Sequence, residues 1–324
     1  MNPIHRRLAL LASMALFAVA SHAQTAWPAK PITLIVPFPP GGFTDNVSRA
    51  VSVELGKTLG QSVIIENRSG AGGRIGTDAI LKAPKDSYTI GLGVPATLSL
   101  LPIIDPKYAQ LAKQYSPITV AVKAYLGFAI NPEKTQARTF QEFVAYAKAN
   151  PDKVAYGTPG AGTSYNLWAE IIADAAGFKP QHIPYRGEAP ALTDLLGGQI
   201  QFMMVTGAAK PYADSGKLLI LATTGAERWS IFPNAPTLKE VGMASDLVAS
   251  GWLAFIAPAG VPKDVIDKLN AAFVKALNQP SVEKVLSSQG YAVIASKPEE
   301  LPRLVEKETT LFSAIVKAGK VKFE

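Results

Sequence analysis

The sequence predicts an α/β protein of two lobes, each with a mainly parallel sheet flanked by helices, and a hinged cleft between the lobes. Short apolar, β-rich segments alternate with helical segments along the chain, which is typical of parallel sheets covered by helices. In addition, a glycine-rich loop of one design occurs twice, at residues 37–45 and 157–164, each time between a strand and a helix. Two such loops, far apart in the chain, indicate two lobes.

The first part of the chain contains a regular succession of expected elements. Residues 46–59 place apolar side chains near one face of a helix, and the glycine-rich residues 67–73 lead into a second helix that extends to Leu81. The strands expected here are residues 32–36, 63–66 and 88–93. The long apolar run 117–130 is interpreted as the first crossing between the lobes.

The second part of the chain repeats the alternation. Thr139 with Glu142 forms a capping box at the start of a helix that ends before Pro151. The strands expected here are residues 154–156, 182–185, 200–205, 218–223 and 252–257, and the helices are residues 139–149, 165–176, 189–197, 262–277 and 298–318. The second crossing is expected between residues 224 and 252. Lobe 1 would then comprise residues 24–123 and 228–324, and lobe 2 residues 124–227.

The first residues are typical of an export signal. A basic start at Arg6 and Arg7 precedes the apolar run 8–20, which is too short to span a bilayer, and Ser21 and Ala23 offer the small residues that a signal peptidase requires. We expect residues 1–23 to be a signal peptide cleaved after Ala23, with the mature protein in the periplasm. The alternative is an uncleaved anchor.

Composition excludes several classes of function. The 324 residues include no cysteine, so disulfides, a thiolate nucleophile and cysteine-ligated metals are excluded. The formal charge is +7, but the basic residues are scattered, whereas nucleic-acid binders usually show a basic stripe. No cluster of metal ligands is visible in the sequence. We therefore expect a monomer without metal, cofactor or nucleic acid.

Two nucleotide-binding motifs are incomplete. Residues 70–76 have the spacing G-x-G-x-x-x-G, one residue too long for a dinucleotide fingerprint, so a tight turn lining the cleft is the better interpretation. Gly157 and Gly162 have the spacing of a P-loop, but Thr163 stands where the lysine must be. An exported hydrolase could use only His182 as its histidine base, since the other two histidines leave with the signal.

The two glycine loops predict a clamp for a small anion. Backbone N–H groups at a helix start lack intrahelical partners, and the helix dipole favours negative charge there. We interpret Asp45 as an N-cap rather than a ligand contact, because a carboxylate would repel an anion. The hydroxyl groups of Thr44, Thr163 and Ser164 can cap a helix and still donate to a ligand.

Several motifs resemble one family in register from Trp27 to the C-terminus. They are residues 27–32 with 37–42, residues 66–73, Pro184-Tyr185-Arg186-Gly187, residues 191–198 and residues 255–260. On these residues the chain is similar to the Bug family, the extracytoplasmic solute receptors of tripartite tricarboxylate transporters. The resemblance implies a type II periplasmic-binding-protein fold that closes on a carboxylate-bearing solute and delivers it to membrane permease subunits.

The resemblance also implies ligand-binding residues. In the family the two loops hold one carboxylate through backbone N–H groups, hydroxyls and bridging waters. Carried over, these contacts fall on Phe38, Gly41, Gly42, Thr44, Gly162, Thr163 and Ser164. A sensor subunit that presents its ligand to a membrane kinase would use the same clamp and remains an alternative.

The chain departs from the family pattern around the expected pocket. Residues 94–96 are Val-Pro-Ala where many members have small polar residues, and residues 205–208 also differ. Phe43 and Tyr165 are bulky for their places and can be core filler or cleft walls. We add Phe43, Tyr165 and Thr206 to the candidate set. The more apolar pocket favours an aromatic or otherwise flat mono- or dicarboxylate.

Overall fold

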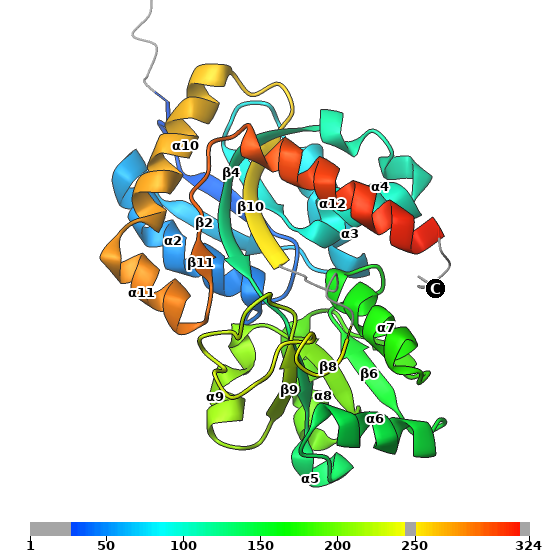
Figure 1. Ribbon diagram of the computed structural model, residues 1–324. Helices are drawn as coiled ribbons and strands as arrows, with labels where there is room; N and C mark the ends of the chain where they lie inside the picture. Colours follow the sequence, from blue (N-terminus) through cyan, green and yellow to red (C-terminus); the bar gives the residue numbers. More distant parts are fainter. Residues whose placement is uncertain (1–26, 244–250, 318–324) are drawn as a thin grey trace, which may run out of the picture.

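The computed structural model describes residues 27–243 and 251–317. These residues form two sheets, one above the other in Figure 1, each with helices on both faces. The expected signal peptide at residues 1–23 lies outside the described residues, as does part of the expected second crossing, residues 244–250. Within the described ranges, no helix is long and apolar enough to cross a membrane.

The sheet of the first lobe has six strands in the order β11-β4-β10-β3-β1-β2. Their bounds are Ile32–Val36 (β1), Val63–Asn67 (β2), Thr89–Gly93 (β3), Tyr115–Ala124 (β4), Gly251–Pro258 (β10) and Ala292–Val293 (β11). Strand β1 is parallel to β2 and β3, whereas β10 is antiparallel to β3 and β4, and β11 is antiparallel to β4.

The sheet of the second lobe has five strands in the order β7-β6-β8-β5-β9. Their bounds are Gly127–Ile130 (β5), Ala155–Thr158 (β6), Gln181–Pro184 (β7), Phe202–Val205 (β8) and Leu219–Thr223 (β9). Strand β6 is parallel to β7 and β8, and β5 is antiparallel to β8 and β9. Both sheets are thus mixed rather than mainly parallel. The antiparallel pairs involve the strands next to the crossings, where the chain leaves one lobe or returns to it.

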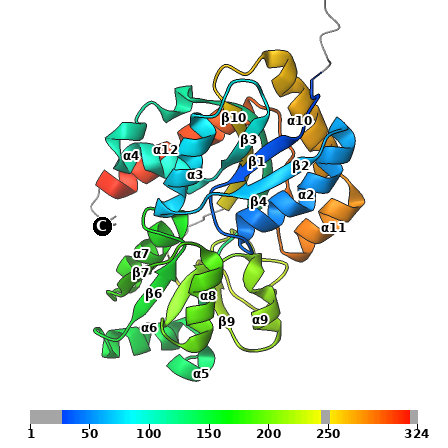
Figure 2. The ribbon, with the colours of Figure 1, turned by 180° about the vertical axis from the view of Figure 1, so that it is seen from behind.

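Helices cover both faces of each sheet (Figures 1 and 2). In the first lobe, α2 (Phe43–Leu59), α10 (Lys263–Leu277) and α11 (Pro280–Ser288) pack on one face, and α3 (Arg74–Leu81), α4 (Leu101–Ile104) and α12 (Glu300–Lys317) on the other. In the second lobe, α6 (Phe140–Ala149) and α7 (Ser164–Ala176) pack on one face and α8 (Glu188–Gly197) on the other. The short helices α5 (Pro132–Thr135) and α9 (Lys210–Asp214) complete this lobe.

The crossings between the sheets are paired with each other. Strand β4 ends at Ala124 and β5 begins at Gly127, so the run 117–130, interpreted as the first crossing, consists of two strands. Between them, the Leu126 N–H donates to Thr224 Oγ1, and the Thr224 N–H donates to the Leu126 carbonyl oxygen. These bonds join the outgoing crossing to the segment that follows β9.

Two segments link the lobes by packing. After β9, Trp229 and Phe232 pack against one face of the second lobe and Leu238 against its other face, while Trp229 Nε1 donates to the Gly290 carbonyl oxygen of the first lobe at 2.9 Å. Helix α12 packs on the first lobe through Leu301 and reaches the core of the second lobe through Phe312. The boundary expected at residues 227/228 falls just before the first of these segments, and the exact lobe boundaries stay a prediction.

Candidate functional site

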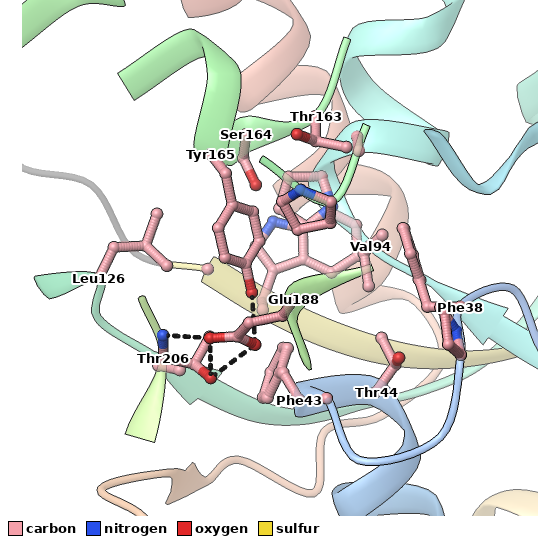
Figure 3. A pocket seen from close by; sticks show the side chains of 18 residues that line it. Phe38, Phe43, Thr44, Val94, Leu126, Thr163, Ser164, Tyr165, Glu188 and Thr206 are labelled. Carbon is pink, nitrogen blue, oxygen red and sulfur yellow. Dashed lines mark hydrogen bonds between the residues drawn. The ribbon is translucent and has the colours of Figure 1, made fainter. Parts of the chain in front are cut away.

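A cavity lies between the two lobes, at the starts of α2 and α7 (Figure 3). The space between its atoms, including its opening to solvent, is about 600 Å³. Its lining comes from both lobes and from the crossing segments. The lining residues are Phe38, Pro39, Gly42, Phe43, Thr44, Val94, Pro95, Ala96, Ala124, Leu126, Pro159, Thr163, Ser164, Tyr165, Glu188, Thr206, Gly251 and Trp252.

The start of α2 lines this cavity. Gly42 is the N-cap residue, with extended backbone and no side-chain cap, and the helix begins at Phe43. The N–H groups of a first helical turn have no intrahelical partner, and the helix dipole adds partial positive charge there. Gly42, Phe43 and Thr44 all line the cavity, so this helix start is suited to a negatively charged group.

Asp45 supports the first loop from behind and is not its N-cap. It lies at the third position of α2, where its Oδ2 accepts a hydrogen bond from the Gly41 N–H at 3.0 Å and from Arg49 Nε at 2.8 Å. Asn67 donates to its other oxygen at 3.0 Å. Although burial opposes ionisation, the hydrogen bonds from Arg49, Gly41 and Asn67 lower the pKa of Asp45. The side chain is absent from the cavity lining, in agreement with a structural role.

The start of α7 repeats this design in the second lobe. Thr163 is the N-cap residue, and its hydroxyl oxygen accepts from the Asn166 N–H at 3.4 Å. Asn166 Oδ1 accepts from the Gly162 N–H at 3.2 Å, just as Asp45 does from Gly41. The Thr163 hydroxyl donates to the Gly160 carbonyl oxygen at 2.8 Å, so it is already engaged within the loop. Ser164 and Tyr165, the first two helical residues, line the cavity.

Eight of the ten candidate residues therefore surround one cavity, and two do not. Gly41 and Gly162 are absent from the lining, and each donates its N–H to a side chain four residues ahead. Gly41 has φ +86° and Gly162 φ +72°, a left-handed conformation that favours glycine. Their role in this arrangement is to turn the chain into the helix. As ligand contacts, the eight lining residues stay a prediction.

Apolar and aromatic side chains make up most of the remaining wall. Val94, Leu126 and Trp252 line the cavity together with Phe38 and the ring of Phe43. Phe43 packs edge-on against Tyr291, with 4.8 Å between ring centroids. Phe43 is therefore both core filler and cleft wall, because it belongs to the core of the first lobe and also lines the cavity.

Glu188 is a lining residue that was not expected. It is the first residue of α8, is 4% exposed and lines the cavity from the second lobe. Its Oε1 accepts from the Thr206 N–H at 2.7 Å, both oxygens lie 2.9 Å from the Thr206 hydroxyl, and Oε2 lies 3.3 Å from the Tyr165 hydroxyl (Figure 3). It also accepts a hydrogen bond from the Phe43 N–H, across the lobes. Burial raises the pKa of Glu188, and these donors oppose the increase.

One sequence signal could have drawn attention to Glu188. It follows Gly187 at a strand-to-helix turn of the second lobe, the same kind of position that the two glycine loops occupy. Thr206 was in the candidate set, and its hydroxyl is now explained by its bonds to Glu188. Burial also raises the pKa of the neighbouring Tyr165 well above its usual value, so its hydroxyl stays protonated and can donate.

Other groups considered from the sequence lie outside the cavity lining. His182 is on the edge strand β7 and lies 2.7 Å from Thr158 Oγ1, and burial lowers the pKa of its ring. The loop at residues 70–73 is not part of the lining; instead Gly72 lies directly against Ala161 of the other lobe. In the part of the chain that the structure describes, no group of three or more acidic or histidine side chains could hold a metal ion.

The comparisons with known proteins agree on one family. Residues 47–321 match the tripartite tricarboxylate transporter family receptor. The chain belongs to this family. Among its relatives, Protein BugT of Bordetella pertussis is 34% identical over 297 residues, which cover 90% of each chain. The resemblance to Bug proteins seen in the sequence is thereby confirmed.

Several solved structures share the fold of this chain. The periplasmic binding protein BugD superposes with a TM-score of 0.86 at 30% identity, covering 91% of this chain and 99% of that one. MatC from Rhodopseudomonas palustris, solved with bound malate, gives 0.85 at 28% identity, covering 90% and 100%. Rpa4515 of R. palustris, solved with adipate, gives 0.84 at 28% identity, covering 90% and 97%. The predicted two-lobed periplasmic-binding-protein fold is confirmed.

Proposed function

We propose that this family receptor is a periplasmic solute-binding protein that captures a small carboxylate between its lobes and delivers it to membrane permease subunits. The N–H groups at the starts of α2 and α7 hold the carboxylate. The single observation that carries the proposal is that both helix starts line one cavity from opposite lobes. A ligand that contacts both lobes at once favours closure, because it binds the closed state better than the open one.

The family supports the chemistry of the ligand. MatC was solved with malate and Rpa4515 with adipate, and both are small dicarboxylates. Among the residues that the structure describes, the lining contains no lysine or arginine. A bound carboxylate would therefore be balanced by backbone dipoles and hydroxyl groups, such as those of Ser164 and Thr44, rather than by a cationic side chain.

The apolar wall supports a preference for flat ligands. Phe43, Tyr165 and Trp252 face the same cavity as the helix starts, and apolar walls with few polar groups are typical of ligand sites. We propose that carboxylates with an aromatic or otherwise planar body bind better than branched, highly charged ones such as citrate. This preference follows from the side chains of this chain and not from its family.

Isothermal titration calorimetry with the mature chain tests the proposal. Each carboxylate is paired with its primary amide, for example benzoate with benzamide and adipate with adipamide. We expect the carboxylates to bind at least tenfold more tightly, and a ligand present at 100 times its dissociation constant adds about 2.7 kcal/mol of stability in a thermal-shift assay. Equal affinity for acids and amides would contradict carboxylate recognition, and tight citrate binding without benzoate binding would contradict the flat preference.

A further inference from the structure

Glu188 places a negative charge inside a cavity that is proposed to bind an anion. Apart from Tyr165, Glu188 is the one residue with an ionisable side chain among the 18 that line the cavity. A simple carboxylate entering beside an ionised Glu188 would bring two like charges together in a poorly solvated site, which is unfavourable. The pocket therefore needs either a neutral Glu188 or a compensating positive charge on the ligand.

The hydrogen bonds around Glu188 are arranged for an ionised carboxylate. The N–H groups of Thr206 and Phe43 can only donate. The Thr206 hydroxyl oxygen lies 3.3 Å from the Ala208 N–H and 3.4 Å from the Tyr291 hydroxyl, so its acceptor capacity is used and its own proton is free for Glu188. A protonated Glu188 would face these donors and could donate only to a hydroxyl oxygen such as that of Tyr165, 3.3 Å from Oε2. Most of the groups around Glu188 thus supply hydrogen bonds to a carboxylate.

Aromatic rings add a second feature that suits a cation. Phe43 and Tyr165 lie beside Glu188 in Figure 3, and Trp252 lines the same cavity. The faces of aromatic rings attract cations, especially when the site is shielded from water. A carboxylate flanked by aromatic side chains is a common way to hold a positively charged nitrogen, since it combines charge with a low-polarity wall.

We propose that the ligand is zwitterionic: a small carboxylate that also carries a positively charged nitrogen, which pairs with Glu188. This inference rests on the proposed function, because the carboxylate of the same ligand is held at the helix starts. The nitrogen lies against Glu188 and the aromatic rings, and the carboxylate lies toward Thr44 and Ser164. The two charges of the ligand then each meet a complementary group, and the cavity needs no lysine or arginine.

Isosteric ligand pairs test this directly, because they differ only in the charge at one atom. Suitable pairs are betaine with 3,3-dimethylbutanoate, 4-aminobutanoate with pentanoate, and 1-methylpyridinium-3-carboxylate with 3-methylbenzoate. They cover a compact, an extended and a flat aromatic body. For the pair that fits the cavity, calorimetry should show the zwitterionic member binding at least tenfold more tightly to the natural protein.

Two variants separate Glu188 from general effects of removing a buried carboxyl group. Glu188→Gln keeps the shape of the side chain and should reduce the preference for the zwitterionic member to less than about threefold, a loss of about 0.7 kcal/mol or more of discrimination. Glu170→Gln is the matched control: Glu170 lies on α7, hydrogen-bonds the Tyr156 hydroxyl and is not part of the lining. It should keep the full preference.

The outcomes distinguish this inference from the proposed function. If the simple carboxylate anions bind as well as or better than their zwitterionic partners, the inference is wrong and the carboxylate receptor stands. If none of the six compounds and none of the other carboxylates binds, the proposed function fails and the inference fails with it. The comparison in the natural protein is decisive even if Glu188→Gln does not fold.

Discussion

The proposed contacts to the ligand are made by single residues at the helix starts. Ser164 is the first residue of α7, where its N–H has no intrahelical partner, and it lines the cavity. Proline is well tolerated at this position of a helix and lacks an N–H. The preceding Thr163 has φ −91° and ψ 161°, a conformation that is compatible with a following proline. One backbone donor can therefore be removed without breaking the helix.

The variant Ser164→Pro should reduce carboxylate affinity by at least tenfold, because it removes this donor. Ser164→Ala is the control that removes only the hydroxyl, and we expect a loss of about threefold or less, equivalent to about 0.7 kcal/mol. Calorimetry measures both affinities, and circular dichroism checks that α7 is intact. Equal affinities for the two variants would show that the α7 N–H is not part of the site.

Most of the candidate residues predicted from the sequence line the cavity, but the sequence did not predict all of its chemistry. The glycine loops and the hydroxyl groups after them were recognisable because helix-start geometry is local. Asp45 was predicted to be the N-cap, whereas the structure places it at the third position of the helix, where it accepts a hydrogen bond from the Gly41 N–H. Glu188 was missed because its burial depends on the docking of α8 against the other lobe, which no local pattern encodes.

At the scale of elements, the repeated β-loop-α units were predictable and the irregular connection was not. Strands β1, β3, β6 and β8 and helices α2 and α7 follow from apolar periodicity. The segment between β3 and β4 instead forms a series of short helical turns that starts at η2 (Ala96–Leu100). Its apolar residues and prolines show no single period, so it was not assigned. The antiparallel crossing strands likewise depend on the return of the chain and not on local sequence.

Helix α12 carries a buried acid whose titration affects stability. Glu308 accepts hydrogen bonds from the Ser99 hydroxyl at 2.7 Å and from Trp252 Nε1 at 3.0 Å. Burial raises its pKa to about 7. Between the ordinary pKa of glutamate and about pH 7, Glu308 therefore keeps its proton in the folded state but has lost it in the unfolded state. Stability from this group is present below the ordinary pKa and is lost as the pH rises through about 7.

The variant Glu308→Gln should remove the loss of stability that accompanies ionisation of Glu308 as the pH rises. We expect it to increase the free energy of unfolding relative to the natural protein at pH 8, by on the order of 2 kcal/mol, with a much smaller difference at pH 5. Urea denaturation at the two pH values measures the effect. A difference between variant and natural protein that is the same at pH 5 and pH 8 would contradict the raised pKa of Glu308.

At the scale of the whole molecule, the lobes meet through glycines. A Cβ atom on Gly207 of the second lobe would lie 1.7 Å from the carbonyl oxygen of Gln289 in the first lobe. Gly72 and Gly160 also meet across the lobes, at 2.9 Å between a Cβ on Gly160 and the Gly72 Cα. These close approaches leave no room for a side chain between the lobes, so bulk at these positions should oppose closure.

The variant Gly207→Ala tests the closure. We expect it to weaken ligand binding by at least tenfold while each lobe stays folded, since the added methyl group meets backbone of the opposite lobe. Gly197→Ala is a matched control, because its Cβ has no neighbour nearer than 4.0 Å. Small-angle scattering with and without ligand should show that the ligand makes Gly197→Ala more compact but leaves Gly207→Ala unchanged. Ligand-induced compaction of Gly207→Ala equal to that of the control would argue against this contact.

The arrangement of the whole molecule makes one claim central: N–H groups at the starts of two helices, one from each lobe, hold a single carboxylate. The most direct measurement is a crystal structure of the protein with a bound carboxylate identified by calorimetry. We expect its oxygens to lie within about 3.2 Å of main-chain nitrogens in the first turns of both α2 and α7. A carboxylate bound elsewhere, or contacting only one of the two helix starts, would contradict the account.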